Sequence, residues 1–174
     1  MKPHIAALAG FLALSLGLSS AQAAAPTDPQ IAAIVVTANQ VDIDAGKLAV
    51  SKAQSPDVKT FAQLMITDHG GVNKSATELV QKLHVTPESN PTSQSLQKGG
   101  DDNLVVLKTL SGSAFDRAYV GHEVVYHQAV LDAIDTTLIP GAQNAELKAL
   151  LVKVRPAFVA HLEHAKHLQS ELGK

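Results

Sequence analysis

Apolar residues recur at intervals of three and four over most of the chain, and this spacing restricts the fold more than any other feature. Residues 28–53 show it first, with Ile31, Ile34 and Val35 leading one face. The same spacing returns in three later segments, residues 56–83, 113–138 and 144–172. This period is that of an amphipathic helix. Four such helices, each about 33 to 43 Å long at 1.5 Å per residue, are expected to form a single bundle.

Helix-starting and helix-breaking residues divide these segments. Asp28 before Pro29 predicts the start of the first helix. A long connection rich in Pro, Ser and Asn separates the second and third helices. Within it, residues 96–110 are expected to form a short helix broken at Gly99 and Gly100. The predicted fold is therefore all-α: a ferritin-like four-helix bundle with a long crossover connection that carries a short helix.

The first 23 residues have the three parts of a secretory signal peptide. Lys2 forms a short positive region, residues 5–18 are apolar, and residues 21–23 are a small-x-small cleavage site. We therefore expect cleavage of the signal peptide, residues 1–23, and a periplasmic domain of residues 24–174. The apolar run is short for a membrane span and no second one follows, so no transmembrane span is expected in the mature chain.

The composition excludes several classes of function. The formal net charge is −2, so the chain has no basic surface for nucleic acid. It contains no cysteine, which excludes disulfides and thiolate metal sites. It also lacks a Gly-x-Ser-x-Gly elbow, a phosphate loop and a dinucleotide fingerprint, so the sequence indicates no class of reaction. The partners we expect are another envelope protein or a second copy of the chain.

Each predicted long helix carries acidic or imidazole side chains near its middle. They are Asp42 in the first helix, Asp68 and His69 in the second, Glu123 and His127 in the third, and His161 and His164 in the fourth. Buried charge is costly unless it is paired or bound to a metal ion. Facing helices of a bundle can build metal sites in its core. Two explanations remain open: a metal centre, or a hydrogen-bonded layer of Asp–His pairs that fixes the register of the helices.

Asp116 has a simpler explanation than the other polar residues. It follows Ser113 at the spacing of a capping box, so we expect it to start its own helix rather than to bind a ligand. Tyr119, one turn later, can bury its ring and offer its hydroxyl to a nearby carboxylate.

Four stretches of the chain resemble a known family. They are "DIDAGKLA", "SPDVKTFAQLMITDH", "SGSAFDRAYVGHEVVYHQ" and "HLEHAKHL". Together, over roughly residues 28–172, they resemble exported bacterial proteins of domain-of-unknown-function family 4142, sometimes labelled predicted outer membrane proteins. The resemblance implies a ferritin-like bundle and no established reaction. It also implies a recurrent polar pattern, which here falls on Asp42, Asp68, His69, Asp116, Tyr119, His127 and His161.

The polar residues depart from the di-iron pattern of ferritin-like proteins, because the chain has no Glu-x-x-His pair. The ligand types fit a His-rich site for one transition metal, Zn, Cu, Ni or Fe. The first hypothesis is therefore a metal-binding envelope protein, with ligands drawn from His69, His127, His161, Asp42 and Glu123. Supporting polar residues are Asp68, Asp116, Tyr119 and His164. The second hypothesis is a non-enzymatic structural or stress-related envelope protein with a buried Asp–His layer.

Overall fold

The computed structural model describes residues 25–173, so the predicted signal peptide lies outside the described residues. Within that range the chain is helical and has no strand. Its long helices are α1 Asp28–Lys52, α2 Pro56–Lys82, α3 Pro91–Thr109, α4 Gly112–Ala133 and α6 Ala145–Leu172. After α4 the chain continues as a short π-helix, η1 (Ile134–Leu138), and a final turn, α5 (Ile139–Gly141). None of the helices in residues 25–173 has the length and apolarity that crossing a bilayer requires.

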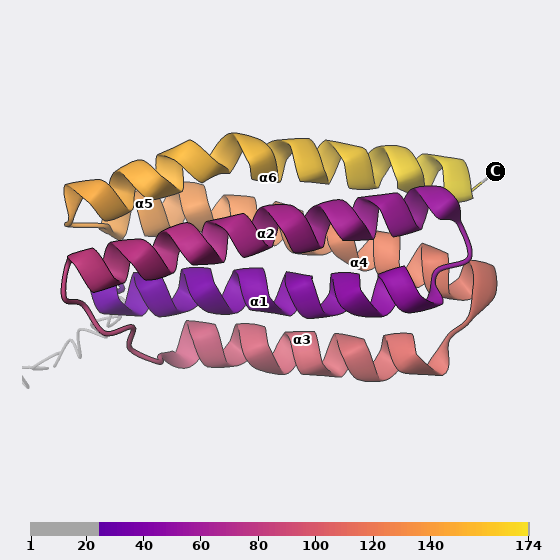
Figure 1. The fold of residues 1–174 in the computed structure, drawn as a ribbon, viewed down its shortest axis with the longest axis horizontal. Coiled ribbons are helices and arrows are strands. Elements are labelled where there is room, and N and C mark those ends of the chain that lie inside the picture. The colour runs from indigo at the N-terminus through magenta and orange to yellow at the C-terminus, as the bar shows by residue number, and fades with distance from the viewer. Residues whose placement is uncertain (1–24, 174) are drawn as a thin grey trace, which may run out of the picture.

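The helices form two antiparallel pairs. α1 packs against α2, and α4 packs against α6. α1 and α6 run in one direction, while α2 and α4 run in the other (Figure 1). α3 lies along α1 and carries the chain from the end of α2 to the start of α4 (Figure 1). Two antiparallel pairs joined by one long crossover are the ferritin-like arrangement, so the predicted fold class is confirmed.

The crossover helix α3 corrects one prediction. We expected a short helix broken at Gly99 and Gly100, but α3 is a continuous helix of 19 residues. Gly100 lies against α1: a Cβ atom placed on it would be 2.7 Å from Cγ1 of Val41. The missing side chain lets α3 approach α1 closely, and this packing outweighs the low helix propensity of the glycine pair.

Asp116 corrects a second prediction. Ser111 precedes α4 as its N-cap, and its side chain makes no capping hydrogen bond. The carboxylate of Asp116 instead accepts hydrogen bonds from the backbone N–H groups of Gln54 at 2.9 Å and Ser55 at 2.8 Å. The prediction that Asp116 starts its own helix is therefore wrong. The loop before α2 packs against the first turn of α4 and offers two donors, which a carboxylate binds strongly.

Asp28 makes the same kind of contact at the opposite end of the bundle. The N-cap of α1 is Thr27, which forms a capping box with Gln30. The carboxylate of Asp28 is then free to accept hydrogen bonds from the backbone N–H groups of Gln143 at 2.9 Å and Asn144 at 2.8 Å. Each of these aspartates thus ties a helix start to the loop before another helix.

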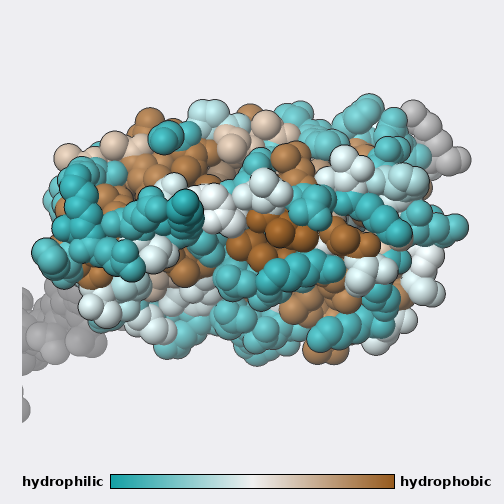
Figure 2. Space-filling view, viewed as in Figure 1, coloured by the Kyte–Doolittle hydropathy of each residue, from teal (hydrophilic) through white to brown (hydrophobic). Residues whose placement is uncertain are grey.

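Two apolar clusters fill the bundle, one toward each end. Ile31 and Leu151 belong to the first, and Phe61 and Phe115 belong to the second. The outer face seen in Figure 2 is a mixture of hydrophilic residues and hydrophobic stretches, one of which lies near its middle. Except for Asp116, the buried polar residues of α1, α2, α4 and α6 lie between the two clusters, at Asn39, Asp42, His69, Glu123, His127 and His161. The core therefore has a polar layer at its middle.

Candidate metal centre

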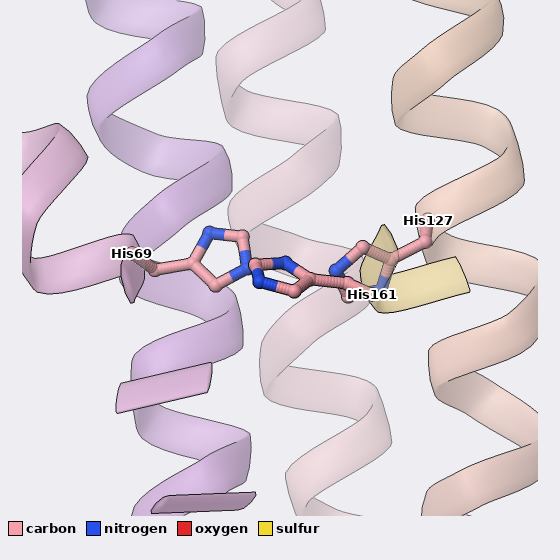
Figure 3. A group of neighbouring side chains, drawn as sticks. All are labelled: His69, His127 and His161. Atoms are coloured by element: carbon pink, nitrogen blue, oxygen red, sulfur yellow. The ribbon is translucent and has the colours of Figure 1, made fainter. Parts of the chain in front are cut away.

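Five titratable side chains from four helices meet in the polar layer. They are Asp42 of α1, His69 of α2, Glu123 and His127 of α4, and His161 of α6. Each is at most 3% exposed. Figure 3 shows the three imidazole rings turned toward one another, and one ring nitrogen of each lies within 4.8 Å of the others. The structure thus brings together the five residues predicted as ligands, which we call the central cluster.

An asparagine behind His69 determines where its proton lies. The Nδ1 atom of His69 is 2.7 Å from Oδ1 of Asn39. The amide nitrogen of Asn39 donates to the carbonyl oxygen of Val35 at 2.7 Å. This second bond orients the amide, so its oxygen faces His69 and can only accept. Nδ1 of the neutral ring therefore carries the proton, and Nε2 of His69 has a bare lone pair.

The other two imidazoles are oriented by the same principle. Nδ1 of His127 lies 3.0 Å from the carbonyl oxygen of Glu123, one turn earlier in α4. Nε2 of His161 lies 2.9 Å from Oδ2 of Asp68 in α2. Both partners are acceptors, so these ring nitrogens donate. The bare nitrogens are then Nε2 of His127 and Nδ1 of His161. Histidines that bind metal ions have such partners on their second nitrogen.

The bare nitrogens of His69 and His127 face a carboxylate instead of hydrogen-bond donors. Oδ2 of Asp42 lies 2.8 Å from Nε2 of His69 and 3.4 Å from Nε2 of His127. Within residues 25–173, no hydrogen bond of acceptable geometry reaches the three bare nitrogens or either carboxylate oxygen of Asp42. Buried acceptors that converge in this way are costly unless a cation lies between them.

The electrostatics of the central cluster act in opposite directions on its two carboxyl groups. Burial disfavours the charged form of Asp42, but the three nearby imidazoles outweigh burial and lower its pKa below the ordinary value. Burial, and then the charge of Asp42, raise the pKa of Glu123 well above its ordinary value. Burial also lowers the pKa of His161, which favours its neutral form. The shifts of the two carboxyl pKa values thus favour a charged Asp42 beside a neutral Glu123.

The predicted supporting residues divide into two groups. Asp68 and Tyr119 lie beside the central cluster. Asp68 is hydrogen-bonded to His161. Burial, and to a smaller extent the charges of Glu123 and Asp42, raise the pKa of the Tyr119 hydroxyl well above its ordinary value. His164 instead packs its half-buried ring edge-on against Phe61, with ring centroids 5.0 Å apart, and Asp116 lies at the end of the bundle.

Asn39 is the functional candidate that sequence reasoning missed. It is 1% exposed and holds the imidazole of His69. The available signal was an amide side chain on the buried face of a helix, three residues before Asp42. A buried amide must be hydrogen-bonded, so its presence on that face indicated a partner on another helix.

Comparison with known proteins identifies the family. Residues 13–168 match the family described as a domain of unknown function, DUF4142. The chain belongs to DUF4142. The resemblance expected from the sequence is therefore confirmed. No curated protein matches this DUF4142 chain in sequence.

Two solved structures share the fold of this DUF4142 chain. One is the crystal structure of a Streptomyces coelicolor protein described as secreted, DUF305. It is 12% identical, with a TM-score of 0.70, over 83% of this chain and 92% of that chain. The other is CopM in the Cu(II)-bound form, 20% identical, with a TM-score of 0.64, over 84% of this chain and 98% of that chain. At these identities the likeness shows the helical-bundle fold alone.

Proposed function

We propose that this DUF4142 protein binds one transition-metal ion through His69, His127, His161 and Asp42. The observation that carries the proposal is that the bare nitrogens of His69 and His127 face a buried carboxylate, while a ring nitrogen of His161 lies within 4.8 Å of a ring nitrogen of each. Ligands of one tetrahedral ion with bonds of about 2 Å lie about 3.3 Å apart. The 3.4 Å between Asp42 Oδ2 and His127 Nε2 is close to that spacing. Glu123 lies next to Asp42 and His127 and is the alternative carboxylate ligand.

The ligand types favour certain ions. Imidazole suits Zn, Cu, Ni and Fe, and the absence of thiolates disfavours sites specialised for Cu(I). CopM, which has the same fold, is described in a Cu(II)-bound form. We therefore take Cu(II) as the first ion to test and Zn²⁺ as the second. The chemistry that a bound ion would supply is that of an electron carrier or a Lewis acid.

In the second candidate function, a proton on His69 takes the place of the metal ion in the central cluster. If His69 were protonated, its 2.8 Å contact with Asp42 would be an ion pair, and the layer would only fix the register of the helices. The protein would then be a structural or stress-related envelope protein. This reading leaves the bare nitrogens of His127 and His161 without donors. A metal ion satisfies all three imidazoles at once, so the metal-binding function is preferred.

We also propose that the protein acts in the periplasm. The segment of residues 1–23 has the composition of a cleavable signal peptide. The chain has no cysteine, so oxidising conditions outside the cytoplasm cannot alter its ligands by forming disulfides. Fractionation of cells that express the full chain tests this, with N-terminal sequencing of the product. Recovery of an uncleaved chain in the cytoplasm would contradict it.

The metal-binding function is tested by elemental analysis of the chain that begins at Ala24, purified without a His tag or a chelator. We expect about one equivalent of a transition metal, or uptake of one equivalent of Cu(II) or Zn²⁺ on titration. His127→Ala should abolish this binding. His164→Ala is the matched control, because His164 lies against Phe61 outside the central cluster, and it should bind as the wild type does.

Two outcomes oppose the proposal. Absence of binding for Cu, Zn, Fe and Mn, with an unchanged melting temperature, would favour the Asp–His layer. Equal loss of metal in His127→Ala and His164→Ala would show that binding does not depend specifically on the central cluster. Circular dichroism of each variant establishes that the bundle is still folded.

A further inference from the structure

A second feature of the bundle is a large cavity in the half where α1 and α6 begin and α4 ends. Its volume is about 850 Å³. It is lined by α1, α2, α4, η1, α6, the start of α3 and the residues just before α1, and its walls are mostly aliphatic. The principal aliphatic residues are Ile34, Val35, Val130, Ile134, Leu151 and Val154. Among the described lining residues none is acidic, basic or histidine.

Two polar side chains in the cavity wall, Tyr126 and Asn39, already have hydrogen-bond partners. The hydroxyl of Tyr126 donates to the carbonyl oxygen of Ala38 at 2.8 Å. The amide of Asn39 is shared between His69 and Val35. The protein itself uses the hydrogen bonds of these two groups. A ligand in the cavity would therefore be held by apolar contacts more than by hydrogen bonds.

Phe158 forms a wall that the cavity shares with the central cluster. It lines the cavity, and its ring centroid lies 5.0 Å from that of His69, 6.0 Å from that of His127 and 6.1 Å from that of His161. One aromatic ring thus separates the cavity from the three imidazoles. A molecule in the cavity would lie against the face of the core that holds the polar layer.

The π-helix supplies an independent observation. Ile134, Thr137 and Leu138 of η1 line the cavity. A π-turn has poorer backbone geometry than an α-turn and occurs frequently at functional sites. Here it lies at the cavity wall, between α4 and the turn at α5.

We propose that the cavity binds one neutral, mainly apolar organic molecule. Its volume falls in the range of small-molecule sites, about 300 to 1,000 Å³. A fatty acid or an amine would bury a charge without a partner, which is costly, so the ligand class is uncharged. Burial of its apolar surface provides the driving force. This proposal does not depend on metal binding at the central cluster.

The test uses N-phenyl-1-naphthylamine, a neutral probe that fluoresces in apolar surroundings, and the chain from Ala24, which contains the whole described bundle. We expect saturable binding of about one equivalent. Ala133→Phe places a ring at the cavity wall and should weaken binding at least tenfold. Ala114→Phe is the matched control, because Ala114 is an exposed residue of α4 outside the cavity lining, and it should leave binding unchanged.

Further measurements separate the alternatives. Ala129→Phe alters an exposed lining position, so it repeats the test if Ala133→Phe fails to fold. His127→Ala should retain probe binding, which separates this proposal from metal binding. Binding that does not saturate, or that is equal in Ala133→Phe, Ala129→Phe and Ala114→Phe, overturns the proposal. So does a dimer in sedimentation that excludes the probe, because a second copy would then cover the cavity.

Discussion

Asp42 and Asp116 are equally buried aspartates with opposite surroundings. They are 1% and 2% exposed. Asp116 faces two backbone N–H groups at 2.9 and 2.8 Å, so the protein alone satisfies its charge. Asp42 faces the bare nitrogens of His69 and His127. The difference teaches that burial of an acid does not identify a binding site. A binding site is identified by the hydrogen-bond donors and acceptors around the acid.

The contrast extends to whole regions of the bundle. At one end Asp116 holds the loop before α2, and at the other Asp28 holds the loop before α6. Both ends are hydrogen-bonded without help from any ligand. Among the described residues no hydrogen bond reaches several buried polar atoms of the central cluster, and under the proposed function a metal ion completes it. Stability should therefore respond to metal at the centre and be indifferent to metal at the ends.

The largest expected effect is stabilisation by metal. At a free metal concentration 1,000 times the dissociation constant, binding to the folded state raises the free energy of unfolding by about 4 kcal/mol. Asp42→Asn should weaken metal binding at least tenfold, because the ligand charge is lost. Urea unfolding of both proteins, with and without Cu(II) or Zn²⁺, measures the effect. An equal metal-induced gain in wild type and Asp42→Asn would move the site away from the central cluster.

The next effect belongs to the end of the bundle. Asp116→Ala removes two charge-assisted hydrogen bonds to the part-buried N–H groups of Gln54 and Ser55, so we expect the free energy of unfolding to fall by about 3 kcal/mol. The loss should be the same with and without metal, and the metal stoichiometry should not change. Urea unfolding and elemental analysis on the same preparation check both points. Loss of metal in Asp116→Ala while the bundle stays folded would show that metal binding also depends on the end of the bundle.

Local patterns in the sequence predict much of this structure. The spacing of apolar residues determines which face of each helix is buried, so Asp42, His69 and His127 could be assigned to buried faces of their helices. Their similar distance from the helix ends then suggests that they meet. These inferences need only the period and length of each helix, which are local properties.

Contacts between distant segments account for what the sequence did not predict. Asp116 binds N–H groups 61 and 62 residues earlier, in a loop whose position depends on how α4 packs. The continuity of α3 depends on the contact of Gly100 with Val41. The role of Asn39 depends on the rotation of α1 relative to α2. None of these follows from helix propensity or capping rules, which describe one segment at a time.

A smaller effect is expected from the residue behind His69. Asn39→Leu removes the acceptor that fixes the tautomer of His69, so we expect metal affinity to fall by about 10- to 100-fold. Asn73→Leu is the matched control, since Asn73 donates to the carbonyl oxygen of Val36 and, among the described residues, forms no hydrogen bond with the central cluster. Competition titration with a coloured chelator measures both variants. Equal affinities in the two variants would show that the tautomer of His69 is determined elsewhere.

The smallest expected effect is a pH slope in the metal-free protein. Burial raises the pKa of Glu123 in the folded state, so above its ordinary value of about 4.3 the unfolded chain releases a proton that the folded chain keeps. Rising pH then destabilises the wild type, by at most about 1.4 kcal/mol per pH unit. Asp42 acts in the opposite sense: its lowered pKa contributes stability above about pH 3.9 that is lost in stronger acid.

Glu123→Gln isolates the first of these slopes, because glutamine keeps the shape of the side chain and has no proton to lose. Relative to wild type, the variant should gain stability steadily as the pH rises from about 4.5 toward neutrality, and the two should be nearly equal at pH 4. Urea unfolding in the presence of a chelator measures this difference. Parallel pH curves for the two proteins would mean that Glu123 is ionised in the folded state. The centre would then hold two carboxylates, and its need for a cation would be greater still.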